Sequence, residues 1–177
     1  MSEDRRLIRI FLAEDHLPDV TLIKEALRRA GLHFEIDHAE DGALAIHSLL
    51  ARDAIGRPDL IIVDLNLPKK TGFDVLAALP RNPVLARVPV VVLTSSNSEN
   101  DRQRAVDLGA TAFLSKPSDL HEFLERVGGV VRDVLARKNS AGGWYQGHRH
   151  DTTPRRQRKA PGCEPVHLRV AQRQGQP

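Results

Sequence analysis

Hydrophobic and polar positions alternate along the chain in a way that predicts five strands and five helices in turn. Nearly continuous apolar runs end at Ala13, Val63 and Leu93, a pattern typical of strands that are buried on both faces. Residues 34–39 instead alternate between apolar and polar side chains, so we expect an edge strand with one solvated face. The run 112–114 is short, as edge strands often are. This alternation of strands and helices predicts a mostly parallel α/β sheet.

Three buried strands and two edge strands favour the order 2-1-3-4-5, that of a flavodoxin-like (βα)5 doubly wound sheet. The last helix would be about 30 Å long at ~1.5 Å per residue, so we expect its Val134 and Leu135 to extend past the sheet. The expected strands are residues 7–13, 34–39, 60–63, 88–93 and 112–114, and the expected helices are 18–30, 41–52, 72–79, 99–108 and 119–138.

Polar residues stand where four of these strands end: Glu14-Asp15, Asp64, Thr94 and Lys116. Because the carboxyl ends of parallel strands lie on one edge of a sheet, we expect these side chains to converge at its switch point, between the first and third strands. Carboxylates gathered in one crevice repel one another unless a cation neutralises them, and oxygen ligands suit Mg²⁺. The sequence therefore predicts Mg²⁺ bound together with a phosphate, and phosphoryl transfer to a carboxylate.

The charge is unevenly distributed. Residues 139–177 hold seven basic residues against Asp151 and Glu164, a net of +5, which leaves −2 for the rest of the chain. The basic pI thus belongs to a Gly/Pro-rich tail that we expect to be disordered, and nucleic-acid binding by the whole chain is not favoured. Cys163 is the only cysteine, which fits a reducing cytoplasm. We find no apolar run long enough for a membrane span.

Five motifs, over residues 5–138, resemble those of a response-regulator receiver domain of two-component signalling, the CheY-like type: Glu14-Asp15, 64–72, Thr94-Ser95, Gly109-Ala110 and Lys116-Pro117. The resemblance implies that Asp64 accepts a phosphoryl group from a sensor histidine kinase. Residues 64–70 and 116–120 are also similar to single-domain regulators that are paired with phytochrome-type kinases. We therefore expect a phosphorylation-controlled signalling protein, whose catalysis is limited to its own phosphoryl transfer and hydrolysis.

The resemblance also implies roles for the other site residues. Lys116 and Thr94 would each bind a phosphoryl oxygen, and Phe113 stands at the position of the aromatic switch that moves with Thr94. Output would come from protein contacts of the receiver surface, because a tail of this length is too short for an output domain with a core. A homodimer through the last helix is a further expectation. The implied Mg²⁺ ligands are Asp15, Glu14, Asp64 and the backbone carbonyl of Asn66.

Three other functions fit the residues less well than a receiver does. An aspartyl-nucleophile phosphatase or phosphotransferase of the haloacid-dehalogenase type would place its nucleophile after the first strand, in an Asp-x-Asp motif. In this chain the first strand ends in Glu14-Asp15, and the candidate acceptor Asp64 follows the third strand. A flavodoxin-like flavin carrier would need a loop that binds phosphate there, and the acidic pair would repel a phosphate. The basic tail could bind nucleic acid or another anionic partner, but its few apolar residues favour a solvated extension. The tail histidines and Cys163 match no zinc module by their spacing.

Overall fold

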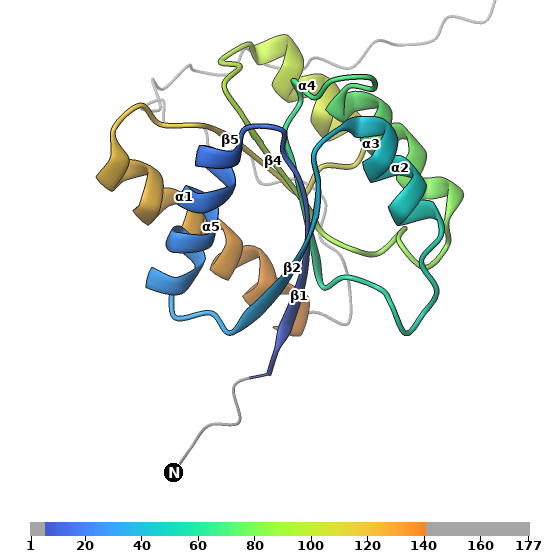
Figure 1. Ribbon diagram of the computed structural model, residues 1–177, viewed down its shortest axis with the longest axis horizontal. Helices are drawn as coiled ribbons and strands as arrows, with labels where there is room; N and C mark the ends of the chain where they lie inside the picture. Colours follow the sequence, from blue (N-terminus) through green and yellow to red (C-terminus); the bar gives the residue numbers. More distant parts are fainter. Residues whose placement is uncertain (1–5, 141–177) are drawn as a thin grey trace, which may run out of the picture. The chain divides into compact units, whose positions relative to one another are not determined.

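Five parallel strands form one sheet in the order β2-β1-β3-β4-β5 in the computed structural model, which describes residues 6–140 (Figure 1). The strands are Ile8–Ala13 (β1), Phe34–Ala39 (β2), Leu60–Val63 (β3), Val90–Thr94 (β4) and Ala112–Ser115 (β5). The residues of β3 and β4 are all buried, whereas β2 alternates between exposed and partly buried positions over most of its length. The predicted strand order and both edge strands are confirmed. The predicted tail, residues 139–177, lies almost wholly outside the described residues.

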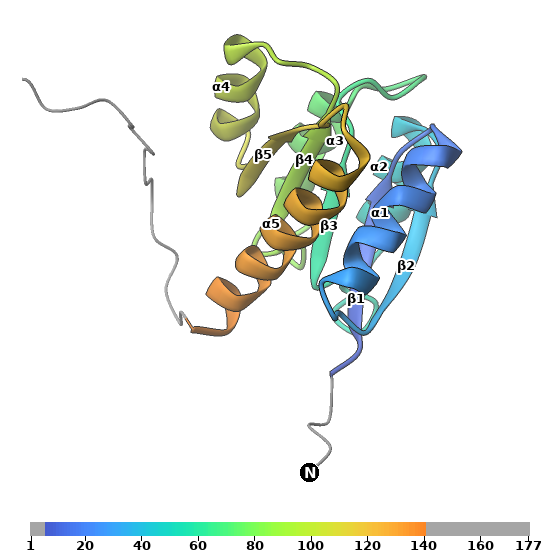
Figure 2. The ribbon, with the colours of Figure 1, turned by 90° about the vertical axis from the view of Figure 1, so that its left-hand side faces the viewer.

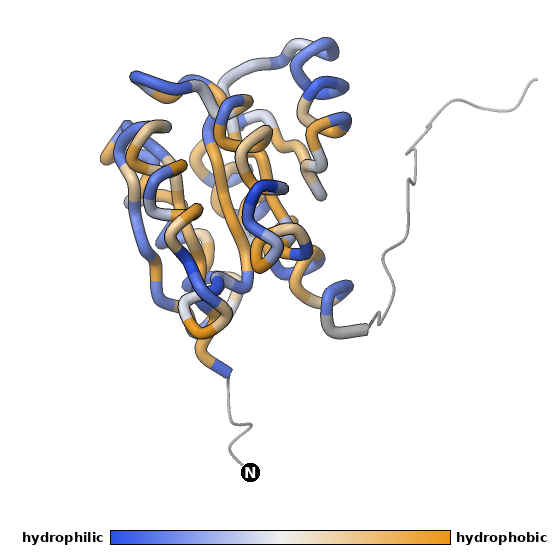
Figure 3. The backbone as a smooth tube through the Cα atoms, turned by 90° about the vertical axis from the view of Figure 1, so that its right-hand side faces the viewer, coloured by the Kyte–Doolittle hydropathy of each residue, from blue (hydrophilic) through white to orange (hydrophobic). Residues whose placement is uncertain are grey.

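Helices cover both faces of the sheet. Helices α1 (Leu17–Arg29) and α5 (Leu120–Ser140) pack on one face (Figure 2). Helices α2 (Gly42–Leu50), α3 (Gly72–Ala78) and α4 (Glu99–Asp107) lie on the other face, and a short 3-10 helix, Leu79–Arg81, follows α3. Hydrophobic residues run along the strands, whereas the helices alternate between hydrophobic and hydrophilic residues (Figure 3). Among the described residues, no helix is long and apolar enough to cross a membrane.

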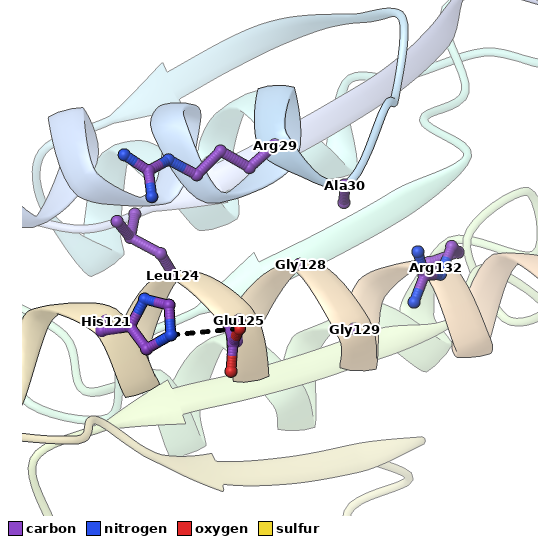
Figure 4. A pocket seen from close by; sticks show the side chains of 8 residues that line it. All are labelled: Arg29, Ala30, His121, Leu124, Glu125, Gly128, Gly129 and Arg132. Carbon is purple, nitrogen blue, oxygen red and sulfur yellow. Dashed lines mark ion pairs between the residues drawn. The ribbon is translucent and has the colours of Figure 1, made fainter.

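The end of α5 differs from our expectation. Val134 and Leu135 are 7% and 9% exposed and belong to the same core cluster as β1 and α1, so the prediction that they extend past the sheet is wrong. The helix packs along α1 for much of its length, and Lys138 Nζ donates to the backbone oxygen of Asp59, 3.1 Å away, just before β3. Gly128 permits this close packing, because a Cβ there would lie 2.7 Å from the carbonyl oxygen of Ala26 and 3.0 Å from the Cβ of Ala30, which Figure 4 shows at the end of α1. Helix length alone does not reveal such an alignment.

Candidate functional site

The carboxyl ends of four strands bring the predicted site residues to one edge of the sheet. Glu14 and Asp15 come directly after β1, Asp64 after β3 and Lys116 after β5, whereas Thr94 is the last residue of β4. One carboxylate oxygen from each of the three acids lies within 4.8 Å of the other two. Parallel strand order places these residues side by side although they lie far apart in the sequence.

The Lys116 ammonium lies at the centre of the acidic cluster, and its side chain is only 9% exposed. Its Nζ is 2.8 Å from Glu14 Oε2, 2.8 Å from Asp19 Oδ2 and 2.7 Å from Asp64 Oδ2. Sequence reasoning missed Asp19. The signal that could have found it is an acidic residue in the first turn of α1, the helix that follows the acidic pair Glu14-Asp15.

Burial and charge shift the pKa values of this cluster in opposite directions. Burial raises the pKa of Glu14, and the hydrogen bond from Lys116 does not fully offset that effect. Burial acts to lower the pKa of Lys116, but its hydrogen bonds to Asp19, Asp64 and Glu14 outweigh it, so the pKa lies above the usual lysine range. Lys116 is therefore a permanent cation that neutralises only part of the surrounding negative charge.

The backbone around Asp64 fixes the orientation of its carboxylate. The backbone N–H of Asn66 donates to Asp64 Oδ1 at 3.0 Å, which leaves Oδ2 for Lys116. The loop after β3 returns tightly, because a Cβ at Gly72 would lie 2.2 Å from the Asp64 carbonyl oxygen. Thr71 and Asp74 form a capping box that begins α3 at this point. Glycine at position 72 is thus required by the close approach of the two backbone segments.

Glu14 is the most deeply buried acid of the site, at 1% exposure. The backbone N–H of His16 donates to Glu14 Oε1 at 3.1 Å, and His38 Nε2 from β2 lies 2.7 Å from the Glu14 carbonyl oxygen. Asp15, by contrast, is exposed. Three carboxylates with one lysine form a hard-oxygen site of net negative charge, and such a donor set fits a divalent cation such as Mg²⁺.

Thr94 and Phe113 are the two predicted switch residues, on β4 and β5, and the carbonyl oxygen of Thr94 accepts from the backbone N–H of Lys116 at 2.7 Å. Thr94 is fully buried, and its hydroxyl oxygen accepts from the backbone N–H of Ser96 at 3.3 Å. Phe113 is half-buried, and the guanidinium carbon of Arg102 in α4 lies 4.7 Å from the centre of its ring. Arg102 also donates to the Phe113 carbonyl oxygen at 3.4 Å. The present position of the Phe113 ring is thus stabilised by a cation–π contact from α4.

Comparison with known proteins decides the family. Residues 10–128 match the family model described as the response regulator receiver domain. The chain belongs to the response-regulator receiver family. The haloacid-dehalogenase and flavin-carrier families are therefore not the family of this chain.

Individual receiver proteins support the same assignment. Response regulator Rcp1 of Synechocystis sp. is 38% identical over 124 residues, which are 68% of this chain and 84% of Rcp1. A crystal structure of the phosphorylated cyanobacterial phytochrome response regulator RcpA superposes with a TM-score of 0.67 at 37% identity, covering 74% of this chain and 96% of that one. The Mn²⁺-bound form of Rcp1 gives a TM-score of 0.62 at 38% identity, covering 70% and 91%.

A fourth comparison concerns a metal-bound receiver domain of a sensor histidine kinase from Pseudomonas aeruginosa PAO1. Its crystal structure has a magnesium ion coordinated in the active-site cleft, and it superposes with a TM-score of 0.55 at 28% identity, covering 70% of this chain and 99% of that one. The receiver fold and the two-component family are thus established for this chain.

Proposed function

We propose that this receiver accepts a phosphoryl group on Asp64 and signals through protein contacts. The observation that carries this proposal is the geometry of the acceptor, whose Oδ1 is held by the Asn66 N–H while Oδ2 lies 2.7 Å from the Lys116 ammonium. The acceptor is therefore oriented by its own loop and stands beside a fixed positive charge. Glu14 and Asp15 adjoin it at the same edge of the sheet.

Phosphoryl transfer to Asp64 would proceed by attack of a carboxylate oxygen on the phosphorus of a phosphohistidine. The new O–P bond forms as the N–P bond breaks, and the histidine leaves with a proton taken from solvent. Lys116 would donate a hydrogen bond to one phosphoryl oxygen as negative charge develops there, and the Thr94 hydroxyl would donate to another. Covalent bonding converts the Asp64 carboxylate into a mixed anhydride, so Lys116 loses an anionic partner and gains one on the phosphoryl group.

The carboxylates of Asp15, Glu14 and Asp64, with the backbone carbonyl of Asn66, would hold Mg²⁺ at this site. A bound Mg²⁺ supplies charge neutralisation for the phosphoryl oxygens. Support comes from the closeness of the three acids and from the metal-bound receivers described above. Asp15→Asn should weaken Mg²⁺ binding measured by titration, because it removes an anionic ligand. Asp133→Asn, which removes a charge from an exposed position of α5, is the matched control and should bind Mg²⁺ as the parent does.

The phosphodonor would be a sensor histidine kinase in the cytoplasm, and similarity to the phytochrome response regulator RcpA favours a phytochrome-type kinase. Output through a homodimer stays a prediction. Since Val134 and Leu135 are buried, its apolar contacts would have to come from residues such as Val106 of α4 and Leu120 of α5, which are 51% and 56% exposed. Sedimentation with and without beryllofluoride tests the dimer, and a monomeric mass in both states would exclude it.

Intact-mass measurement after incubation with acetyl phosphate and Mg²⁺ tests the acceptor. The parent and Asp133→Asn should each gain one phosphoryl group, whereas Asp64→Asn should gain none. Phosphorylation of Asp64→Asn to the same extent as the parent would show that the acceptor is another residue. The proposed donor is tested in the same way. The rate of phosphoryl transfer to the receiver from a phosphorylated phytochrome-type kinase is compared with the rate from a kinase of an unrelated type.

A further inference from the structure

Lys116 has one anionic partner that the proposed function does not use. Asp19 Oδ2 is as close to Lys116 Nζ as Glu14 Oε2 is, 2.8 Å in each case, and Asp64 Oδ2 is at 2.7 Å. A lysine ammonium has three N–H donors, so these three carboxylates engage all of them. A phosphoryl oxygen can therefore reach the ammonium only where a carboxylate gives up its hydrogen bond.

The start of α1 holds Asp19 in place. Asp19 is the third residue of the helix, and its Oδ1 lies 3.0 Å from His16 Nδ1. Burial raises the pKa of Asp19, but hydrogen bonds from Lys116 and His16 outweigh this effect and hold it below its usual range. The helix N-terminus favours the anion further. Asp19 is thus a negative charge fixed beside the lysine.

Asp19 does not belong to the group of acids that fits a metal. Among the described residues, the acids whose oxygens gather within 4.8 Å are Glu14, Asp15 and Asp64. The side chain of Asp19 is 21% exposed, whereas that of Glu14 is 1% exposed. Asp19 therefore contacts the site through its hydrogen bond with Lys116.

Resting on the proposed function, we infer that Asp19 is a positioning residue that competes with the phosphoryl group for Lys116. When Asp64 becomes phosphorylated, the Lys116 N–H that donated to Asp64 donates to a phosphoryl oxygen instead. The other two Lys116 N–H groups still donate to Glu14 and Asp19. Asp19 then neutralises part of the ammonium charge and weakens its hold on the phosphoryl group. The Asp19 and Asp64 oxygens lie 2.8 Å and 2.7 Å from the same nitrogen, so they are at most about 5.5 Å apart, close enough for a full charge to act strongly.

Binding of beryllofluoride, a phosphoryl mimic, tests this inference on the full chain by calorimetric titration at saturating Mg²⁺. Asp19→Asn keeps the shape and one acceptor oxygen but removes the charge, and it should bind beryllofluoride about tenfold more tightly than the parent. Asp19→Glu, which restores the charge, should return the affinity toward that of the parent. Glu25→Gln is the matched control, because it removes the same charge from the same helix, at a residue that pairs with Arg28 and Arg29.

The affinity for Mg²⁺ alone separates Asp19 from a metal ligand. Asp19→Asn should weaken Mg²⁺ binding less than Asp15→Asn does, because it removes a nearby charge but no oxygen ligand of the metal. Asp19→Ser serves as a second neutral variant, with the same expectation, should Asp19→Asn fail to fold. Beryllofluoride affinity of a folded neutral variant that equals or falls below that of Glu25→Gln overturns the inference. A parent that binds no beryllofluoride in Mg²⁺ overturns the proposed function itself, so the two failures are distinct.

Discussion

Removal of the Lys116 ammonium should destabilise the protein strongly when Mg²⁺ is absent. Lys116→Met keeps an unbranched side chain of similar length but leaves Glu14 and Asp64, which are 1% and 5% exposed, without their cation. Breaking a buried ion pair by removing one partner costs about 3–5 kcal/mol. We expect about 3 kcal/mol, the lower end, because Glu14 can take up a proton. For a domain of this size, that corresponds to a melting temperature lower by roughly 10 °C.

The pH dependence gives this prediction a sign. Burial already raises the pKa of Glu14, and loss of Lys116 removes the effect that opposes this rise. A carboxyl group whose pKa is higher in the folded state than in the unfolded state stabilises the fold at low pH, and this contribution is lost as the pH rises through the folded pKa. Lys116→Met should therefore be more stable relative to the parent near pH 5.5 than near pH 8.

Mg²⁺ should restore much of the lost stability, by about 2.7 kcal/mol at a concentration of 100 times its Kd. Thermal unfolding followed by circular dichroism, with chelator or Mg²⁺ at both pH values, measures all three effects. Lys138→Met is the control, since Asp59 keeps its hydrogen bonds from Arg6 and from the Arg9 N–H when Lys138 is removed. If Lys116→Met melts within a degree or two of Lys138→Met in chelator, the ammonium does not offset the buried acids and the reasoning is refuted.

Three further predictions concern the loops and the switch. Gly72→Ala should lower the free energy of unfolding several times more than Gly109→Ala. Gly109 has a φ of +92°, which strains an alanine, but a Cβ there would meet nothing within 4 Å. Chemical denaturation measures both losses, and equal losses would contradict the close approach at position 72. Asp41→Ala should cost about 1–2 kcal/mol, because the α2 cap and the ion pair with Lys69 are both lost; Asp41→Asn, which keeps the cap, should recover part of this. Arg102→Ala should leave stability within about 1 kcal/mol of the parent but speed amide exchange in β5, and unchanged exchange would mean that the cation–π contact does not restrain Phe113.

The sequence by itself determined the sheet and most of the acidic site. Hydrophobic periodicity is a local property, so continuous and alternating runs distinguished the buried strands from the edge strand β2 before any contact was known. The strand order then placed Glu14, Asp64 and Lys116 at one edge, because parallel strands leave no other arrangement for their carboxyl ends. The structure bears out this convergence.

Only the tertiary structure decided how the helices sit on that sheet and what they add to the site. Asp19 in the first turn of α1 meets Lys116, which follows β5, and such a contact depends on helix placement, which periodicity does not encode. The burial of Val134 and Leu135 and the stacking of Arg102 on Phe113 depend likewise on the tilt and depth of α5 and α4. Spacing along the chain tells which face of a helix is apolar, whereas the packing of that face against its neighbours sets which side chains meet.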